Sequence, residues 1–403
     1  MIEIDVTPVS KNEALVNEIE PESLIKWMGR NIRLLKNMLD PKLLLIKTLA
    51  YCLFPLAARC VVFTSTRSFK KRCQPERLNQ SRQTLRELGG QEISLRMPDG
   101  HSIFGMYLDA RSALNALIAK GGERGTIPVG DNVQQVLWIS PAQPELWSSI
   151  ERMGIEVHEH QNRSYIKLGI PKQLSDAANS GGQIEAGTLI YGPGSGHQFE
   201  FRRKTLGAFL FGYGMNVLVF HYSGTGESGG KISEQATYEN VEGAYQYLRE
   251  KGISDEKILG YGHCMGGGPV LDLAANHPHI NVLADRTYTT MGEFCKHRAT
   301  RLLYLPRFLH FLTSWIEPVM NKCFYYNNRE KIKQVSGHFA ILEASRDDLI
   351  VSDYIQELFD NAVLARSRLR LLMDSNHDMD LVPNEATRLS LGQFLTATNL
   401  IGY

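Results

Sequence analysis

The sequence predicts an α/β fold in which a mostly parallel sheet carries helices on both faces. From residue 187 onward, short apolar segments alternate with helix-compatible segments, the order that helical crossovers between parallel strands produce. A Gly-x-Cys-x-Gly pentapeptide at 262–266 joins one apolar segment to a helix-compatible run. An acid and a histidine, Asp347 and His377, then follow the last two predicted strands.

Composition sets limits on what the chain does. The 403 residues are 43% hydrophobic and 22% charged, which is ordinary for a globular protein with a sizeable core. The net charge of +1 gives no general attraction to nucleic acid, so no nucleic-acid partner is expected. The six cysteines form no Cys-x-x-Cys pair, so we expect neither a zinc site nor a cofactor, and their scattered positions favour a reducing compartment.

Residues 1–88 are predicted to form a helical N-terminal extension. The first residues lack the order of a signal peptide, and no uncharged run is long enough to span a bilayer. One helical stripe is apolar, at Leu24, Met28, Ile32, Leu35 and Leu39. Lysines and arginines occupy another face, and a basic cluster follows at 67–72. This pattern suits contact with a membrane surface, and it equally suits a helical cap packed on the main domain.

The main domain is predicted to cover residues 89–403. It begins with a β-hairpin at 91–109, whose turn is Asp99-Gly100. Residues 110–186 are predicted to be a strand-rich insertion. Strands are then expected at 188–191, 216–221, 257–261, 281–284, 339–343 and 368–373, and helices at 198–213, 233–251, 265–276, 291–330, 352–364 and 384–398.

Cys264 stands where a nucleophile would stand on a tight turn between strand and helix. Such a turn needs glycine two residues to either side, because side chains there would collide with neighbouring elements. The following helix would aim its N-terminus at the sulfur and stabilise negative charge there. By itself the pentapeptide also fits a core cysteine in a turn.

The acid and the base of a triad are expected at the same edge of the sheet. Asp347 and His377 follow successive strands, and ligands bind at the carboxyl edge of open α/β sheets. Asp348 and the more distant Asp285 are alternative acids, although Asp285 is better explained by an ion pair with Arg286. Singly, Asp347 could be a turn or cap residue and His377 an exposed loop residue. Together with Cys264 they follow the order nucleophile, acid, base.

Two backbone amides should hold a developing oxyanion. One is expected from Met265, at the start of the helix after the nucleophile. The other is expected from the glycine-rich turn at 191–197, where Pro193 has no amide hydrogen and the donor must be Ser195 or Gly194. An ordinary glycine turn remains the alternative. The second glycine-rich turn, at 220–229, lacks the lysine of a phosphate-binding loop and is interpreted as a wall of the site.

As a set, these motifs resemble an α/β-hydrolase over 187–403 plus the hairpin. More narrowly, the helical N-terminal region, the oxyanion turn and residues 285–290 resemble the chlamydial 43-kDa and Legionella SidB-type effector hydrolases. That resemblance implies a lipid or acyl-ester substrate. It also implies secretion from the bacterial cytoplasm into a host cell, to its cytosol or a membrane surface. The chain has cysteine where the family usually has serine. Either it resembles the dienelactone-hydrolase-like enzymes, which use cysteine, or it is a trapping variant of a serine enzyme.

The expected activity is hydrolysis of an acyl ester or thioester through Cys264, His377 and Asp347 with a covalent acyl-enzyme. A cysteine peptidase or ubiquitin-directed enzyme would use the same triad, and a non-catalytic scaffold would keep the fold and bind lipid or protein without turnover. The aromatic helical region at 291–330 is expected to be a lid over an apolar substrate, with an aromatic core as the alternative. It includes Tyr304, Leu305, Phe308, Phe311, Leu312 and Trp315.

Overall fold

The structure is a computed structural model, and it describes residues 75–129, 132–169, 186–195, 198–302, 310, 313–379, 381 and 385–401. The predicted helices before residue 75, with their basic face and the cluster at 67–72, lie outside the described residues. Most of the aromatic residues proposed for the lid, at 303–309 and 311–312, also lie outside them. None of the helices in the described ranges has the length and hydropathy that a membrane crossing requires.

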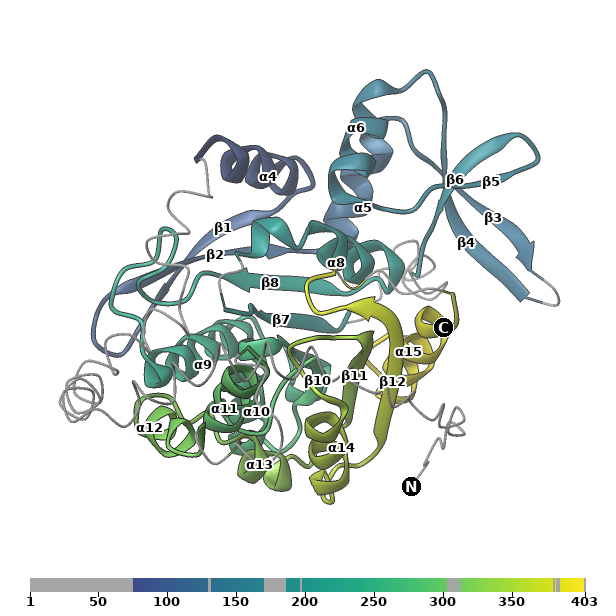
Figure 1. The fold of residues 1–403 in the computed structure, drawn as a ribbon. Coiled ribbons are helices and arrows are strands. Elements are labelled where there is room, and N and C mark those ends of the chain that lie inside the picture. Colours follow the sequence, from purple (N-terminus) through teal and green to yellow (C-terminus); the bar gives the residue numbers. More distant parts are fainter. Residues whose placement is uncertain are drawn as a thin grey trace, which may run out of the picture. The chain divides into compact units, whose positions relative to one another are not determined.

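An eight-stranded sheet organises the chain, and its order is β1-β2-β8-β7-β9-β10-β11-β12 (Figure 1). The first two strands form the predicted antiparallel hairpin, and β2 is also antiparallel to β8. All the remaining pairs are parallel. The strand bounds are β1 Gln91–Arg96, β2 Ser102–Leu108, β7 Thr188–Gly192, β8 Asn216–Phe220, β9 Ile258–His263, β10 Asn281–Asp285, β11 Phe339–Arg346 and β12 Arg368–Asn376. The predicted α/β-hydrolase fold, a mostly parallel sheet with helices on both faces, is confirmed.

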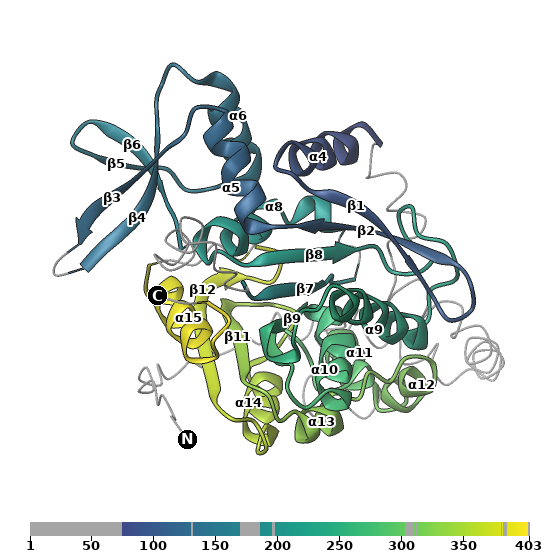
Figure 2. The same ribbon diagram turned by 180° about the vertical axis from the view of Figure 1, so that it is seen from behind.

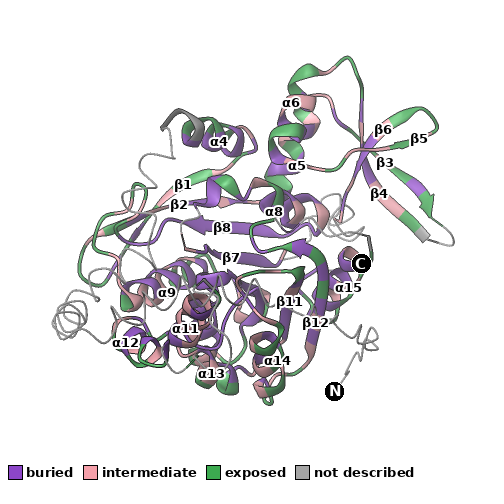
Figure 3. Ribbon diagram, in the orientation of Figure 1, coloured by how far each residue is buried: buried purple, intermediate pink, exposed green. Residues whose placement is uncertain are grey.

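Helices cover both faces of this sheet (Figures 1 and 2). Helices α9 (Glu234–Glu250), α10 (Gly267–Asn276), α13 (Asn328–Lys331) and α14 (Ser352–Asn361) pack in sequence against one another on one face. The other face carries α4 (Pro75–Glu87), α8 (Arg203–Gly207) and α15 (Glu385–Ala397). The central strands between these layers are buried along their whole length (Figure 3). Helices α11 (Met291–Leu302) and α12 (Ile316–Cys323) follow β10.

Residues 110–169 form a unit with its own sheet. Two helices, α5 (Ala110–Ala119) and α6 (Pro144–Met153), accompany four antiparallel strands in the order β3-β4-β6-β5. The strands are β3 Glu123–Val129, β4 Asn132–Ile139, β5 His158–His160 and β6 Arg163–Lys167. Side chains of this unit, such as Leu114, Leu137 and Leu146, belong to the same buried cluster as Leu189 and Val217 of the main sheet. The unit therefore shares a core with the main sheet.

One predicted helix and two predicted strands differ from the structure. The helix expected at 198–213 is three short pieces: a 3-10 turn at Phe199–Phe201, α8, and a π-helical turn at Ala208–Gly212. The last two strands are longer than predicted, because β11 reaches Arg346 and β12 reaches Asn376. The charged and polar residues near these strand ends gave no hydrophobic alternation to mark them. As a result Asp347 and His377 each come directly after a strand, rather than several residues beyond it.

Candidate active site

Cys264 lies on the turn between β9 and α10, and its backbone conformation is rare for a residue other than glycine. Its φ is +51°, in the left-handed region that non-glycine residues rarely occupy. The following 3-10 turn, Cys264–Gly266, leads directly into α10. The side chain is 8% exposed, so the sulfur is nearly enclosed. A strained backbone conformation thus holds this thiol at the carboxyl edge of the sheet.

Gly262 and Gly266 flank Cys264, and neither position has room for a side chain because backbone segments approach closely there. A Cβ on Gly266 would lie 2.0 Å from the carbonyl oxygen of Gly192, and one on Gly262 would lie 2.5 Å from that of Gly266. The predicted oxyanion turn is therefore pressed against the turn that bears Cys264. A Cβ on Gly194 would be 3.5 Å from the Cβ of Cys264, which puts this turn beside the nucleophile as well.

His377 lies between the predicted acid and the predicted nucleophile. Its Nδ1 is 2.9 Å from Oδ2 of Asp347, and the Cys264 side chain is near enough to its ring to raise the pKa of the imidazole. Both His377 and Asp347 are buried, with side chains 5% and 2% exposed. The structure brings together these three residues, which are distant in the sequence.

The electrostatics of the histidine favour its charged form. Burial alone would lower the pKa of His377, but the charge of Cys264 and the hydrogen bonds to Asp347 and Cys264 outweigh burial and raise the pKa to about 10. At neutral pH the ring therefore carries a second proton.

Asp347 is oriented at both of its oxygens. Its Oδ1 accepts hydrogen bonds from the amides of Leu349 and Ile350, both 2.8 Å long, and its Oδ2 faces His377. Burial would raise the pKa of Asp347, but these bonds and the charge of His377 outweigh it and lower the pKa below its usual value. The carboxylate therefore stays ionised and holds the ring with Nδ1 protonated.

The alternative acids have other partners. The side chain of Asp348 is 67% exposed and lies 3.8 Å from Arg298. Asp285 is buried, pairs with Arg286 through two 2.7 Å contacts, and accepts a 2.7 Å hydrogen bond from the Tyr261 hydroxyl. Asp347 is thus the acid that the structure places at the ring of His377.

The proposed oxyanion donors lie at the expected elements. Met265 is buried in the 3-10 turn directly after Cys264, so its amide is at the start of the helical segment. Ser195 lies in the turn after β7, whose last residue, Gly192, is in register with Gly262 of β9. The two turns therefore meet beside Cys264.

The loop after β10 forms another wall of the site. In the sheet, Asp285 is in register with His263, so the residues after β10 run beside the nucleophile turn. The Thr287 hydroxyl donates a 2.7 Å hydrogen bond to the carbonyl of Cys264. The adjoining Tyr288 hydroxyl is buried and finds no hydrogen-bond partner within the described ranges. Burial, with smaller effects from Tyr326 and Cys264, raises the pKa of Tyr288, so this hydroxyl keeps its proton and can donate to a bound molecule.

A second aspartate–histidine–serine set lies elsewhere, and its geometry makes it structural. His101, at the hairpin turn, contacts Asp99 through Nδ1 and lies 2.8 Å from the Ser223 hydroxyl through Nε2. Ser223 is fully buried, and its hydroxyl also accepts a 2.8 Å bond from the Asn240 amide. A substrate cannot reach that oxygen, so the set links the hairpin to the turn after β8.

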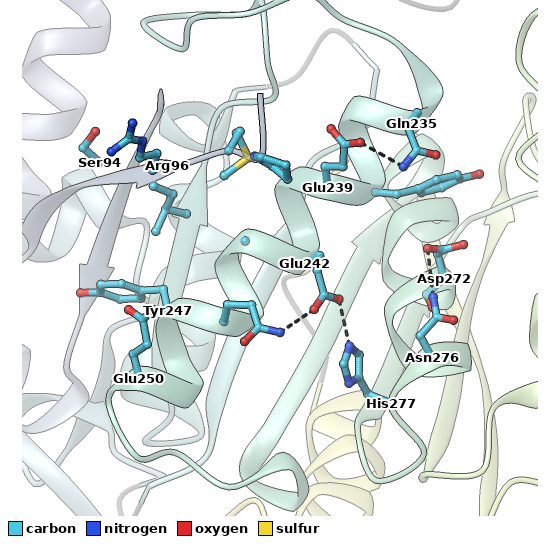
Figure 4. Close-up of a pocket in the computed structure, with 16 residues that line it drawn as sticks. Ser94, Arg96, Gln235, Glu239, Glu242, Tyr247, Glu250, Asp272, Asn276 and His277 are labelled. Carbon is cyan, nitrogen blue, oxygen red and sulfur yellow. Dashed lines mark hydrogen bonds and ion pairs between the residues drawn. The ribbon is translucent and has the colours of Figure 1, made fainter. Parts of the chain in front are cut away.

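A cavity of about 890 Å³ lies away from the triad (Figure 4). It is lined by β1, α9 and the C-terminal end of α10, and Glu242 contacts His277 at 2.9 Å within it. His277 follows the last of the ten residues of α10, so it lies about 15 Å along the axis from the start of that helix. This cavity therefore belongs to the opposite end of the helix that begins at the nucleophile. No group of three or more potential metal ligands occurs among the residues that the structure describes.

Sequence reasoning missed the residues that support the site. Arg286 and Arg202 donate to the loop that carries His377, and Arg82 of α4 forms a buried ion pair with Glu200, beyond the oxyanion turn. Nothing local marks Arg82 or Arg202, because each contacts a segment more than 100 residues away. Only the unusual Asp285-Arg286 pair gave a signal, and it was assigned to structure.

Comparison with known proteins finds relatives in sequence and in structure. No family model matches the chain. α/β-Hydrolase domain-containing protein 17C of Mus musculus is 25% identical over 183 residues, which cover 45% of this chain and 51% of the relative. α/β-Hydrolase domain-containing protein 17B of Xenopus tropicalis is 26% identical over 183 residues, covering 45% and 56%. The chain thus spans about half the length of the curated relatives it matches. The Pyrococcus furiosus esterase Pf2001 aligns with a TM-score of 0.49 at 14% identity, covering 77% of this chain and 91% of that one. The sequence relatives support the α/β-hydrolase superfamily.

Proposed function

We propose that this chain, built on the α/β-hydrolase fold, hydrolyses acyl esters or thioesters through a covalent acyl-enzyme on Cys264. One observation carries the proposal: the ring of His377 is hydrogen-bonded to Asp347 and has its pKa raised by Cys264, which lies on a strained turn. A nucleophile, a base and an orienting acid in this arrangement are what acyl transfer requires.

The reaction follows from the charges at the site. With the proton already on His377, the sulfur attacks the acyl carbonyl as a thiolate, and the C=O electron pair moves onto oxygen. The amides of Met265 and Ser195 hold that oxyanion. Collapse of the tetrahedral intermediate breaks the bond to the leaving alcohol or thiol, which takes its proton from His377. The acyl group is then attached to Cys264 as a thioester.

Release needs one water molecule. His377, now neutral, removes a proton from water as the water attacks the thioester carbonyl. The second tetrahedral intermediate expels the sulfur, and the acid product leaves. With a sulfur nucleophile we expect this second half to be slow, which suits thioester substrates and acyl transfer to other acceptors.

The substrate is proposed to be a lipid or another long acyl compound. The region at 291–330 follows the wall beside Cys264 and includes α11 and α12, where a lid would lie. Trp315, just before α12, is 45% exposed, as an apolar contact for an acyl chain would be. The narrower resemblance to effector hydrolases extends the proposal to work at a host membrane surface, with the N-terminal extension as the contact.

Hydrolysis of p-nitrophenyl esters from acetate to laurate tests the function. We expect turnover that prefers longer chains, and loss of at least about 10³-fold in kcat for Cys264→Ala. Cys323→Ala is the matched control, since Cys323 is a free cysteine on α12. Activity that survives Cys264→Ala would refute the proposal. Labelling of Cys264 by a ubiquitin-based electrophile, without ester turnover, would support the ubiquitin-directed alternative.

A further inference from the structure

The loop that carries His377 is held by its backbone carbonyls. Four consecutive carbonyl oxygens, from residue 376 to residue 379, each accept a hydrogen bond from a side chain of another segment. Nη1 of Arg286 donates to the carbonyls of Asn376, at 2.7 Å, and Met379, at 2.9 Å. These two bonds enclose the base residue between them.

The two inner carbonyls are held from the other sides of the site. Nε2 of His263 lies 3.1 Å from the carbonyl of His377 itself, and Nη1 of Arg202 lies 3.0 Å from that of Asp378. A carbonyl can only accept, so His263 must carry its proton on Nε2. His263 directly precedes Cys264, so one hydrogen bond ties the backbone of the base to the strand that presents the nucleophile.

Arg286 is itself fixed in place. It is 1% exposed, and its Nε and Nη2 each lie 2.7 Å from an oxygen of Asp285. The Tyr261 hydroxyl donates to the same carboxylate. A buried ion pair is costly unless its remaining hydrogen-bond donors find acceptors. Here the remaining guanidinium nitrogen, Nη1, donates to the loop that carries His377. The guanidinium plane is therefore a rigid support for that loop.

We propose that Arg286 is a positioning residue, which together with His263 and Arg202 fixes the backbone of the loop so that the imidazole of His377 lies between Cys264 and Asp347. The inference rests on the proposed function, because positioning has meaning only if these three residues act together. The groups that hold the loop come from the loop after β10, from the nucleophile strand β9 and from the segment after the oxyanion turn. The same contacts that hold the loop thus set its distance from each working part of the site.

A positioning role makes a different prediction from a structural one. Displacement of a reacting group by about 1 Å can cost on the order of 10²-fold in rate. Loss of stability alone would lower the amount of folded enzyme without changing the reactivity of the thiol in the folded fraction. The reactivity of Cys264 toward iodoacetamide, followed against pH, therefore separates the two.

The test compares Arg286→Lys and Arg202→Gln with the intact chain. Peptide mass spectrometry measures the alkylation rate of Cys264, with Cys323 in the same sample as the reference thiol. In the intact chain we expect Cys264 to react faster than Cys323, because His377 lies beside Cys264 and can take the proton of its thiol. In Arg286→Lys this advantage should fall by about 10- to 100-fold, and kcat should fall equally with KM unchanged. Arg202→Gln removes one bond of the four, and a several-fold loss is expected.

Arg370→Lys is the matched control, because Arg370 pairs with Glu343 between β12 and β11, on the strand that leads to His377. It should change stability without changing the pH profile of Cys264. Wild-type Cys264 that reacts no faster than Cys323 would refute the proposed function itself. A fast wild-type thiol whose profile is unchanged in Arg286→Lys and Arg202→Gln would overturn the positioning role alone. If circular dichroism shows that Arg286→Lys does not fold, Arg202→Gln decides: an unchanged profile overturns the inference.

Discussion

The aspartate at the site shows how much of the chemistry depends on single hydrogen bonds. Asp347 uses both oxygens, one for two backbone amides and one for His377, whereas its neighbour Asp348 faces solvent and Arg298. The sequence indicates that the acid is Asp347 or Asp348, but it cannot tell which of the two side chains contacts His377. Neighbouring side chains point in different directions, and only the structure shows which one faces the ring.

Asp347→Asn tests the role of the acid in catalysis. An amide can hold His377 only in the wrong tautomer or more weakly, so kcat should fall by about 10²- to 10⁴-fold. Asp348→Asn is the control, and it should keep activity near that of the intact chain. Steady-state kinetics on a p-nitrophenyl ester measure both. Equal losses of kcat in the two variants, or a larger loss in Asp348→Asn, would mean that Asp347 is not the acid of the triad.

The lowered pKa of Asp347 also predicts an acid dependence of stability. A carboxyl whose pKa is lower in the folded state stabilises the fold above its unfolded pKa of about 3.9, and that contribution disappears as pH falls through the lower folded value. The difference in unfolding free energy between the intact chain and Asp347→Asn should therefore be constant near neutrality and shrink below about pH 4. Urea unfolding at several pH values measures it. A difference that grows in acid would mean that the sign of the pKa shift is opposite.

At the scale of elements, the site depends on the contact between two turns. The turn at Cys264 and the turn after β7 meet through Gly266 and the carbonyl of Gly192, with no room for a Cβ between them. The sequence predicted this close approach, because a glycine stands two residues to either side of Cys264. The breaks in the segment at 198–213 were not foretold, because its apolar residues suit a regular helix and only packing selects the 3-10 and π turns.

Gly266→Ala should separate these two turns. The added methyl would force the backbone apart, costing about 1–3 kcal/mol of unfolding free energy. Because the proposed oxyanion donors, Met265 and Ser195, come one from each turn, kcat should fall by about 10²-fold. Gly212→Ala, in the π-helical turn, is the control, since a Cβ there meets nothing within 4 Å and its φ is not positive. Full activity in Gly266→Ala would mean that the two turns do not share the oxyanion.

At the scale of the whole described structure, the unit at 110–169 and the main sheet depend on one core. Leu146 of α6 and Leu114 of α5 are buried in the cluster that also contains Phe209 and Val217. The sequence indicated a strand-rich insertion, but it could not show that the insertion shares a core, because apolar periodicity does not say which partner an apolar face meets. The parallel sheet was easier to predict, since its strands are continuous buried runs.

Leu146→Ala should destabilise the main sheet together with the inserted unit. Removing a fully buried leucine side chain costs about 2–5 kcal/mol, and a shared core transmits the loss to one common transition. Val133→Ala, at an exposed position on β4 of the same unit, should change stability by less than about 0.5 kcal/mol. Urea unfolding followed by circular dichroism and by protease susceptibility of the unit tests this. Two separate transitions would show that the unit folds independently.

The most direct measurement is the site of the acyl adduct. The intact chain is mixed with p-nitrophenyl butyrate, stopped with acid within a turnover and digested for mass spectrometry. We predict a butyryl group on the peptide that contains Cys264, and none in His377→Ala, where the thiol lacks its base. No adduct on Cys264, or equal labelling of Cys264, Cys295 and Cys323 that persists in His377→Ala, would contradict the account.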